Sequence, residues 1–379
     1  MGTFVNPDNS AFQVALNSEI YVDKTGLIEY TNRSAKTLQS YICISRPRRF
    51  GKSIAANMLS AYYTCEYDSR ELFSNLKIAS SDSYEKHLNK YDVIFLNMQE
   101  FLSQSSNVEE MLSLLKKSVI WDLLDKYPDF RYFDETNLMR TLQDIYNKTK
   151  RPFVVIIDEW DCIFREYITD KKAQEKYLDF LRDLLKDKGY VALAYMTGIL
   201  PIKKYGTHSA LNMFDEFSMI DPGPLAEYVG FTEEEVRNLC KTYNMDMQEV
   251  KSWYDGYSFE GAPSVYSPRS VVSCMRFGKF GNYWNQTETF EALQFYIDMN
   301  FDGLKDDVLS MIAGESVPVN TGSFTNDMAT FHTEDDVLTL LIHLGYLAYD
   351  YDNKTVKIPN NEVRAEYVSS VSVSDWGEV

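Results

Sequence analysis

Two short polar stretches of this sequence have the residue types that phosphate chemistry requires. Gly51-Lys52-Ser53 directly follows the apolar run 41–45 and opens a helical pattern. A phosphate-binding loop needs main-chain N–H groups, a helix N-terminus and a lysine for the outer phosphates. Asp158-Glu159 follows the apolar run 153–157; such a pair can hold Mg²⁺ and polarise an attacking water, or simply cap a helix. Together the two stretches predict a nucleotide site.

The loop before Lys52 departs from the usual pattern. Such a loop normally opens with glycine six residues before the lysine, and Arg46 occupies that position here. Glycine relieves crowding at a tight turn, but every residue except proline supplies a main-chain N–H group. We therefore expect an altered loop that still binds phosphate. Its predicted nucleotide-binding residues are Arg46, Arg48, Arg49, Phe50, Gly51, Lys52 and Ser53.

The elements that would position these residues alternate between strands and helices. Buried strands are predicted over 41–45, 92–98, 153–158 and 190–198, and helices over 53–63, 107–125, 136–149 and 174–188. This alternation indicates a parallel sheet covered on both faces, and such sheets bind ligands at the carboxyl ends of their strands. The predicted fold class is therefore α/β, with a P-loop NTPase sheet flanked by helices over residues 1–222.

The character of the sequence changes after residue 222. Pro222, Gly223 and Pro224 interrupt regular structure, and Thr232 with Glu235 forms a capping box that opens a helix. The remaining sequence is mainly helical and ends with a helix, a hairpin that turns at 352–354, and another helix. We expect residues 223–379 to form a helical lid and a winged-helix-like region.

Composition limits the partners of this chain. The 38 Lys and Arg residues against 56 Asp and Glu residues give a net charge of −18, which disfavours broad binding to DNA. The five cysteines form no CxxC pattern and the four histidines lie far apart, so no zinc site is expected. The sequence has no apolar run near the ~20 residues that span a bilayer and no secretion signal. We expect a cytoplasmic protein that does not bind membranes.

Further motifs resemble those of the bacterial AAA-ATPase-like family. The matching stretches are YVDKTGLI (21–28), SRPRRFGKS (45–53), VVIIDEWD (154–161), MTGI (196–199), GFTEEEV (230–236), WYDGYSF (253–259), VYSPRSV (265–271), NYW (282–284), and LGYLAYD with IPNNEVRAEYV (344–368). They follow in order over nearly the whole chain. The resemblance implies that Lys52 and Ser53 bind ATP, that Asp158 and Glu159 are the magnesium and water residues, and that Arg46 is a family trait.

Members of that family often carry a PD-(D/E)XK nuclease-like domain at their C-terminus, and this chain stops where that domain would begin. Asp352-x-Lys354 and Glu249-x-Lys251 fit the D/E-x-K fragment of such nucleases. The first lies in a predicted turn and the second on a helix face, and neither has an acidic partner on a preceding strand. We expect no nuclease activity from this chain, although a nuclease-like protein could be its partner.

Four further positions each have more than one interpretation. Thr197 stands where related ATPases place a sensor of the γ-phosphate, or its hydroxyl only caps a strand end. Arg48 and Arg49 could contact phosphate, an acidic partner domain or solvent. Arg269 could supply a cation to the nucleotide from the lid, or lie on the surface after a turn proline.

Assembly and activity follow from the same residues. Ring-forming relatives place an arginine finger in a region that here, from 183 to 236, contains no arginine, so we expect a monomer or small oligomer. The predicted function is Mg²⁺-dependent ATP hydrolysis, coupled to movement of the lid or a partner, with Lys52, Asp158 and Glu159 as catalytic residues and Ser53 with Asp158 as metal ligands. The alternative is a nucleotide-operated binding module with negligible turnover that regulates a nuclease-like partner or domain.

Overall fold

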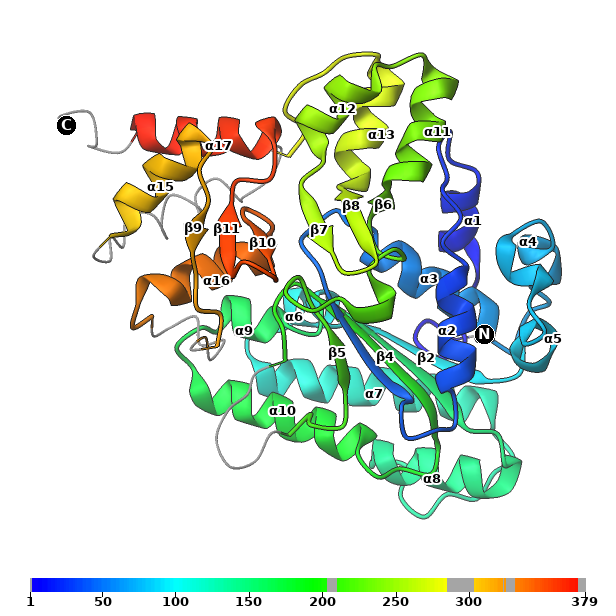
Figure 1. Cartoon of the computed structure of the whole chain (residues 1–379). Helices are drawn as coiled ribbons and strands as arrows, with labels where there is room; N and C mark the ends of the chain where they lie inside the picture. Colours follow the sequence, from blue (N-terminus) through cyan, green and yellow to red (C-terminus); the bar gives the residue numbers. More distant parts are fainter. Residues whose placement is uncertain (1, 203–209, 285–302, 323, 325–330, 374–379) are drawn as a thin grey trace. The chain divides into compact units, whose positions relative to one another are not determined.

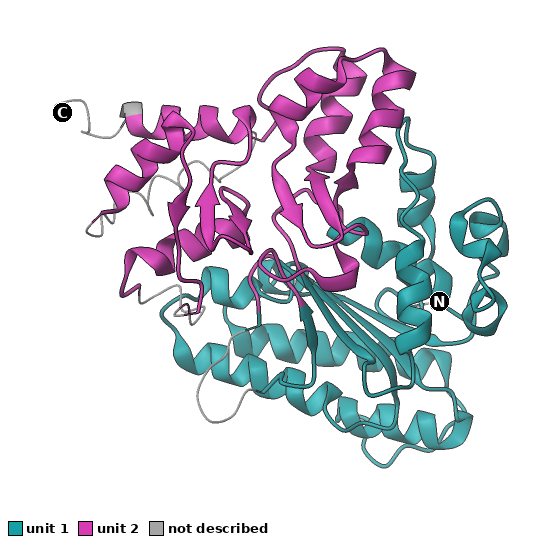
Figure 2. Ribbon diagram, in the orientation of Figure 1, with its two compact units in different colours: residues 1–44, 52–198, 202–216 teal, residues 45–51, 199–201, 217–379 magenta. Residues whose placement is uncertain are grey.

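The computed structural model describes residues 2–202, 210–284, 303–322, 324 and 331–373. It divides into two compact units (Figure 2). Unit 1 comprises Met1–Ile44, Lys52–Gly198 and Ile202–Glu216, and unit 2 comprises Ser45–Gly51, Ile199–Pro201 and Phe217–Val379. The phosphate-loop residues before Lys52 are therefore grouped with the C-terminal half of the chain. The domain boundary at residue 222 remains a prediction.

The largest sheet contains all four predicted strands and one short additional strand (Figure 1). Its strands are β1 (Tyr41–Ser45), β2 (Asp92–Asn97), β3 (Phe153–Asp158), β4 (Val191–Gly198) and β5 (Asp215–Phe217). The order is β2-β3-β4-β1-β5, and β2–β3 and β3–β4 pair in parallel. Every residue of β3 is buried, as its unbroken apolar sequence predicts. The predicted α/β fold with a parallel sheet flanked by helices is confirmed.

Several helices of unit 1, though not its first two, begin at a capping side chain. The longer ones are α1 (Ser10–Leu16), α2 (Gly26–Ser34), α3 (Lys52–Tyr63), α6 (Met98–Ser103), α7 (Val108–Lys126), α8 (Leu138–Thr149) and α10 (Lys171–Leu185), with short helices α4 (Arg70–Phe73), η1 (Lys77–Ser80), α5 (Tyr84–His87) and α9 (Cys162–Glu166). The side chains of Asn107, Asn137 and Asp170 accept hydrogen bonds from the first turns of α7, α8 and α10. Helix α3 packs across β2, β3 and β4.

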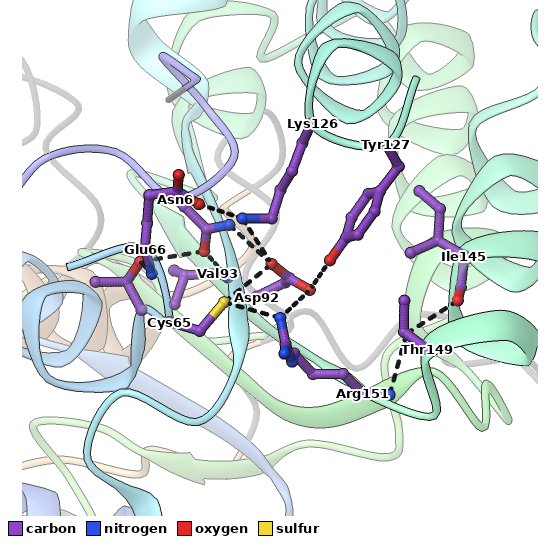
Figure 3. Close-up of polar contacts among 11 residues, drawn as sticks. Asn6, Cys65, Glu66, Asp92, Val93, Lys126, Tyr127, Ile145, Thr149 and Arg151 are labelled. Carbon is purple, nitrogen blue, oxygen red and sulfur yellow. Dashed lines mark hydrogen bonds and ion pairs between the residues drawn. The ribbon is translucent and has the colours of Figure 1, made fainter. Parts of the chain in front are cut away.

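A buried carboxylate fixes the amino end of β2 (Figure 3). Asp92 is fully buried, and its partners are Asn6 (2.8 Å), Cys65 (3.3 Å), Tyr127 (2.6 Å), Lys126 (3.5 Å) and Arg151 (3.8 Å). Burial and the Asp92 carboxylate raise the pKa of the Cys65 thiol to about 11. Because these partners come from four separate segments, the network ties together the edge of the sheet that lies away from the nucleotide-site residues.

Unit 2 contains two small antiparallel sheets in addition to its helices. The sheet β6-β8-β7 is formed by β6 (Phe231–Thr232), β7 (Tyr257–Phe259) and β8 (Ala262–Tyr266), with helices α11 (Glu233–Tyr243), α12 (Met247–Tyr254) and α13 (Pro268–Phe277). The predicted capping box between Thr232 and Glu235 is present. Strands of two to five residues are too short for a reliable periodic pattern, so the sequence did not predict this sheet.

The second small sheet contains the predicted C-terminal hairpin. It has the order β10-β11-β9, with β9 (Val317–Pro318), β10 (Ala348–Asp350) and β11 (Thr355–Lys357), and it accompanies α15 (Leu304–Ala313), α16 (Glu334–Leu344) and α17 (Asn361–Val373). The predicted order of helix, hairpin and helix is confirmed, and Asp352 lies in the turn. Among the described residues, none of the helices combines the length and apolar character that a bilayer span requires.

Candidate nucleotide-binding site

The phosphate loop is the chain between β1 and α3, and two of its residues have left-handed backbone conformations. Gly51 has φ +93° and Arg49 has φ +70°. Glycine adopts such a conformation at no steric cost, whereas for arginine it is a strained one. Helix α3 begins at Lys52, directly after this turn. The turn leads directly into a helix N-terminus, the kind of position where phosphate often binds, and phosphate binding at these residues remains a prediction.

The structure brings Ser53 and Asp158 together within unit 1. The Ser53 hydroxyl donates a hydrogen bond of 2.6 Å to Oδ2 of Asp158, and the Thr197 hydroxyl donates to Oδ1 of the same carboxylate. Sheet order explains this meeting, because β4 lies between β1 and β3. Thr197 and Asp158 are both buried. Thr197 is therefore held against the carboxylate and does not simply cap its own strand.

Lys52 is a buried cation close to three carboxylates. Only 5% of its surface is exposed. Burial lowers the pKa of Lys52, and the negative charges of Glu159, Asp161 and Asp158 oppose that shift. A buried ammonium group attracts the phosphates of a nucleotide strongly. Its acidic neighbours repel the same phosphates until Mg²⁺ offsets their negative charge.

Glu159 has an unusual backbone and a cationic partner. Its φ is +53°, a strained value for a glutamate, and its carboxylate pairs with Arg165 at 2.5 Å. Burial raises the pKa of Glu159, while Lys52 and then Arg165 oppose the rise. Arg165 also contacts the fully buried Asp161 at 3.3 Å, one turn earlier on the chain. Arg165 is thus anchored by Asp161 and holds the side chain predicted to activate water.

Sequence reasoning missed Arg165 and Asp161. Their signal was the spacing of an acidic and a basic residue four positions apart directly after the Asp158-Glu159 pair. Such pairs are common on exposed helices, so the spacing alone does not distinguish a buried site residue from a surface pair. The structure makes the distinction because the Arg165 side chain is only 13% exposed.

Arg46 uses its guanidinium to fix the main chain of unit 2. It is fully buried, and Nη1 donates to the carbonyl oxygens of Ser45, Phe217 and Ser218 at 3.0, 3.1 and 2.8 Å. Its guanidinium also lies over the Phe259 ring, 5.4 Å from the centroid. These contacts give the residue in the usual glycine position a role in holding the loop.

The remaining loop residues also have partners in unit 2. Phe50 is buried and meets the Tyr257 ring edge to face at 5.4 Å. Arg49 donates from Nη1 to the carbonyl oxygens of Tyr283 at 2.6 Å and Trp284 at 3.2 Å. Burial lowers the pKa of Arg49, and the charges of Arg269 and Arg48 lower it further. The predicted lid cation Arg269 therefore lies close enough to Arg49 for the two charges to interact.

The carboxylates considered for nuclease chemistry lie on two separate elements of unit 2. Asp352 is in the β10–β11 turn, and Glu249 lies in the first turn of α12, where its N–H bonds to Asp246. Within the described part of the chain, no group of three or more His, Cys, Asp or Glu residues is arranged to hold a metal ion. A magnesium ion beside Ser53 and Asp158 would need oxygen ligands from the nucleotide and water, which is how Mg²⁺ is usually held.

The sheet, the loop after β1 and the acidic pair after β3 define a P-loop nucleotide-binding ATPase fold. Comparison with known proteins agrees: the profile of the family described as "Predicted AAA-ATPase" matches residues 11–207. The chain belongs to this AAA-ATPase-like family.

Individual relatives are distant. An uncharacterized protein in the vnfD 5′ region of Azotobacter chroococcum mcd 1 is 23% identical over 277 residues, which cover 71% of this chain and 51% of that protein. The chain thus spans about half the length of this curated relative. Among solved structures, the Aeropyrum pernix ORC2 protein in ADPNP–ADP complexes is 13% identical with a TM-score of 0.41, covering 96% of this chain and 98% of that one. The Aeropyrum pernix ORC1 protein in complex with DNA is 10% identical with a TM-score of 0.32, covering 98% and 97%. Both scores are too low to extend the assignment beyond the family.

Proposed function

We propose that this chain binds ATP at the phosphate loop and hydrolyses it with Mg²⁺. The observation that supports the proposal most directly is the bonded set of Ser53, Asp158 and Thr197 beside the buried Lys52. These residues lie at the carboxyl ends of adjacent strands, where a parallel sheet binds its ligand. Bound Mg²⁺ would neutralise phosphate charge, with the oxygens of Ser53 and Asp158 available as its protein contacts.

The residues of the chain divide the work of hydrolysis. The main-chain N–H groups of the loop and the Lys52 ammonium would stabilise the charge that develops on the phosphoryl oxygens. Glu159 would orient the attacking water and accept its proton, and its burial favours that role because burial raises the pKa of its carboxylate. Thr197 would hold Asp158 in a fixed orientation. Arg269, with Arg276 as the next candidate, would supply positive charge in place of an arginine finger from a neighbouring subunit.

The ion pair between Glu159 and Arg165 favours slow turnover. A carboxylate held by a guanidinium is a weaker base and is restrained in orientation. This observation also supports the second candidate function, a module that binds ATP with negligible turnover and regulates a protein or nuclease-like partner. We propose that the chain works as a monomer or small oligomer in the cytoplasm, without DNA as its main ligand.

Three variants test the proposal. Lys52→Ala should abolish binding of a fluorescent ATP analogue, because the buried cation of the loop is lost, whereas Lys117→Ala on an exposed turn of α7 should bind normally. Glu159→Gln should keep ATP affinity and lose phosphate release, with exposed Glu175→Gln as the control. Arg269→Ala should lower turnover by more than Arg276→Ala does, and normal turnover in Arg269→Ala would remove this residue from the site.

The possible outcomes separate the two candidate functions. If Lys52→Ala binds ATP as tightly as the parent chain, the assignment of the ATP site to this loop is wrong. The binding module would be favoured if the parent chain binds ATP but releases phosphate no faster than Glu159→Gln does, with or without DNA present.

A further inference from the structure

One peptide unit of unit 2 is hydrogen-bonded at one end to the Arg49 guanidinium and at the other to the Glu362 carboxyl group. The carbonyl oxygen of Tyr283 accepts a hydrogen bond of 2.6 Å from Nη1 of Arg49. The N–H group of the same peptide unit, which belongs to Trp284, donates at 3.0 Å to Oε1 of Glu362 on α17 and, at the same distance, to Oδ1 of Asn282. The result is a continuous chain of hydrogen bonds from a guanidinium through one peptide group to a carboxylate.

The contacts on either side reinforce this chain. The N–H of Tyr283 donates to the same Glu362 oxygen at 2.7 Å, and the Trp284 carbonyl accepts from Arg49 at 3.2 Å. The Tyr254 hydroxyl bonds to Gly281 through both its carbonyl and its N–H, and Asn282 donates to Glu366 on α17. The segment 281–284 is therefore clamped between the phosphate loop, α12 and α17 of unit 2.

The charges around Arg49 favour the binding of an anion to its guanidinium, which would compete with the hydrogen bonds to the main chain. Arg49 lies among cations, since Arg269 and Arg48 both disfavour its charged form, and Glu362 is the carboxylate that favours it. Glu362 is only 1% exposed; burial raises the pKa of its carboxyl group, and the Tyr283 and Trp284 N–H groups oppose that rise. Hydrogen bonds in such chains strengthen one another, so loss of the bond at one end weakens the bond at the other.

We infer that Glu362 is a positioning residue for Arg49, acting through the Tyr283–Trp284 main chain, and that this link reports phosphate occupancy of the loop to helix α17. A bound phosphate would compete with the two carbonyl oxygens for the Arg49 guanidinium. When Arg49 turns to the phosphate, the Trp284 N–H becomes a poorer donor and its bond to Glu362 weakens. The inference rests on the proposed function, because it requires a nucleotide in the loop.

Hydrogen–deuterium exchange on the full chain tests the link directly. We compare peptides covering 47–58, 279–284 and 361–373, with and without a non-hydrolysable ATP analogue and Mg²⁺. In the parent chain, nucleotide should protect 47–58 and make exchange in 279–284 faster, on the order of tenfold, which is the effect of losing one charge-assisted hydrogen bond. Exchange at the start of α17 should rise in the same samples.

Variants identify the two ends of the link. In Arg49→Gln, residues 279–284 should exchange fast without nucleotide, and adding nucleotide should change their exchange no further. Arg49→Lys keeps a positive charge and hydrogen-bond donors, so it should recover part of the response to nucleotide. Glu362→Gln should raise the basal exchange of 279–284, whereas the exposed control Glu315→Gln should match the parent chain. A purely structural role for Arg49 would give fast exchange that Arg49→Lys does not correct.

The parent measurement alone distinguishes the two ways to fail, even where a variant does not fold. If nucleotide leaves 47–58 unprotected, the proposed ATP site is wrong. If nucleotide protects 47–58 while 279–284 and 361–373 exchange as before, ATP binds and the link from Arg49 to Glu362 is overturned.

Discussion

The buried Glu362 carboxylate should make the stability of the chain depend on pH in the range near neutrality. Burial raises its pKa from 4.5 to about 7, although the Tyr283 and Trp284 N–H groups and the Ser270 side chain oppose the rise. The charged groups that face it are Arg49 and Glu366. Four buried or partly buried neighbours, Tyr254, Tyr257, Cys274 and Tyr283, stay neutral here because burial raises the pKa of each.

The sign and size of the effect follow from linkage. The folded chain retains the Glu362 proton at pH values where the unfolded chain has lost it, so the stabilising contribution is complete at low pH and is lost as the pH rises through about 7. The pKa difference is 7 − 4.5 = 2.5, and each unit corresponds to about 1.4 kcal/mol. Between about pH 5 and about pH 8, the free energy of unfolding should fall by about 2–3 kcal/mol through this one group.

Glu362→Gln isolates this contribution, because glutamine has a similar shape and does not titrate. Urea unfolding is measured for the parent chain, Glu362→Gln and the exposed control Glu135→Gln at several pH values. The difference in unfolding free energy between parent and Glu362→Gln should shift in favour of the variant as the pH rises, whereas the control should follow the parent. Parallel curves for parent and Glu362→Gln would refute the account of a buried carboxylate that retains its proton near neutral pH.

Two further predictions concern unit 1. Arg165→Gln removes a cation that lowers the pKa of Glu159, so the acidic limb of the pH profile of phosphate release should move to higher pH. The acidic limb of Arg165→Lys should stay nearer that of the parent chain. An acidic limb that does not move in Arg165→Gln would contradict the pairing of Glu159 with Arg165. A Cβ on Gly198 would lie 2.7 Å from the Trp160 ring, whereas a Cβ on Gly189 would meet nothing closer than 3.7 Å. Gly198→Ala should therefore lower the urea unfolding free energy by about 1–3 kcal/mol and Gly189→Ala should not; equal stability of the two variants would show that the strand end relaxes freely.

Much of unit 1 could be predicted from sequence because its elements have strong local signals. Strand β3 is an unbroken apolar run, and the predicted strand at 41–45 agrees with β1 residue for residue. The helix predicted over 107–125 is observed as α7 (Val108–Lys126), since Asn107 marks its start. The regular geometry of a parallel sheet then places Asp158 and Thr197 at neighbouring strand ends and Ser53 in the first turn of the helix after β1, as their positions in the sequence suggested.

The rest depends on contacts between residues far apart in the chain. Nothing in the local sequence indicates that Arg46 donates to carbonyl oxygens more than 170 positions away, or that Arg49 meets Tyr283. The role of Arg165 could not be predicted for a different reason. Its spacing from Asp161 is that of an ordinary ion pair on a helix surface, and only its burial distinguishes it from such a pair. The sheet β6-β8-β7 was missed because its strands are short.

The peptide unit between Arg49 and Glu362 also affects how the link would be seen in a family alignment. Searches for pairs of positions that change together detect side chains that must fit one another. Here each charged side chain meets main-chain atoms of residues 283 and 284, so neither has to adjust to the side chain at those positions. Substitutions at 283 and 284 could therefore accumulate independently of positions 49 and 362. We expect covariation methods to miss the part that residues 283 and 284 play in this connection, and physical measurement to be the way to find similar links in related proteins.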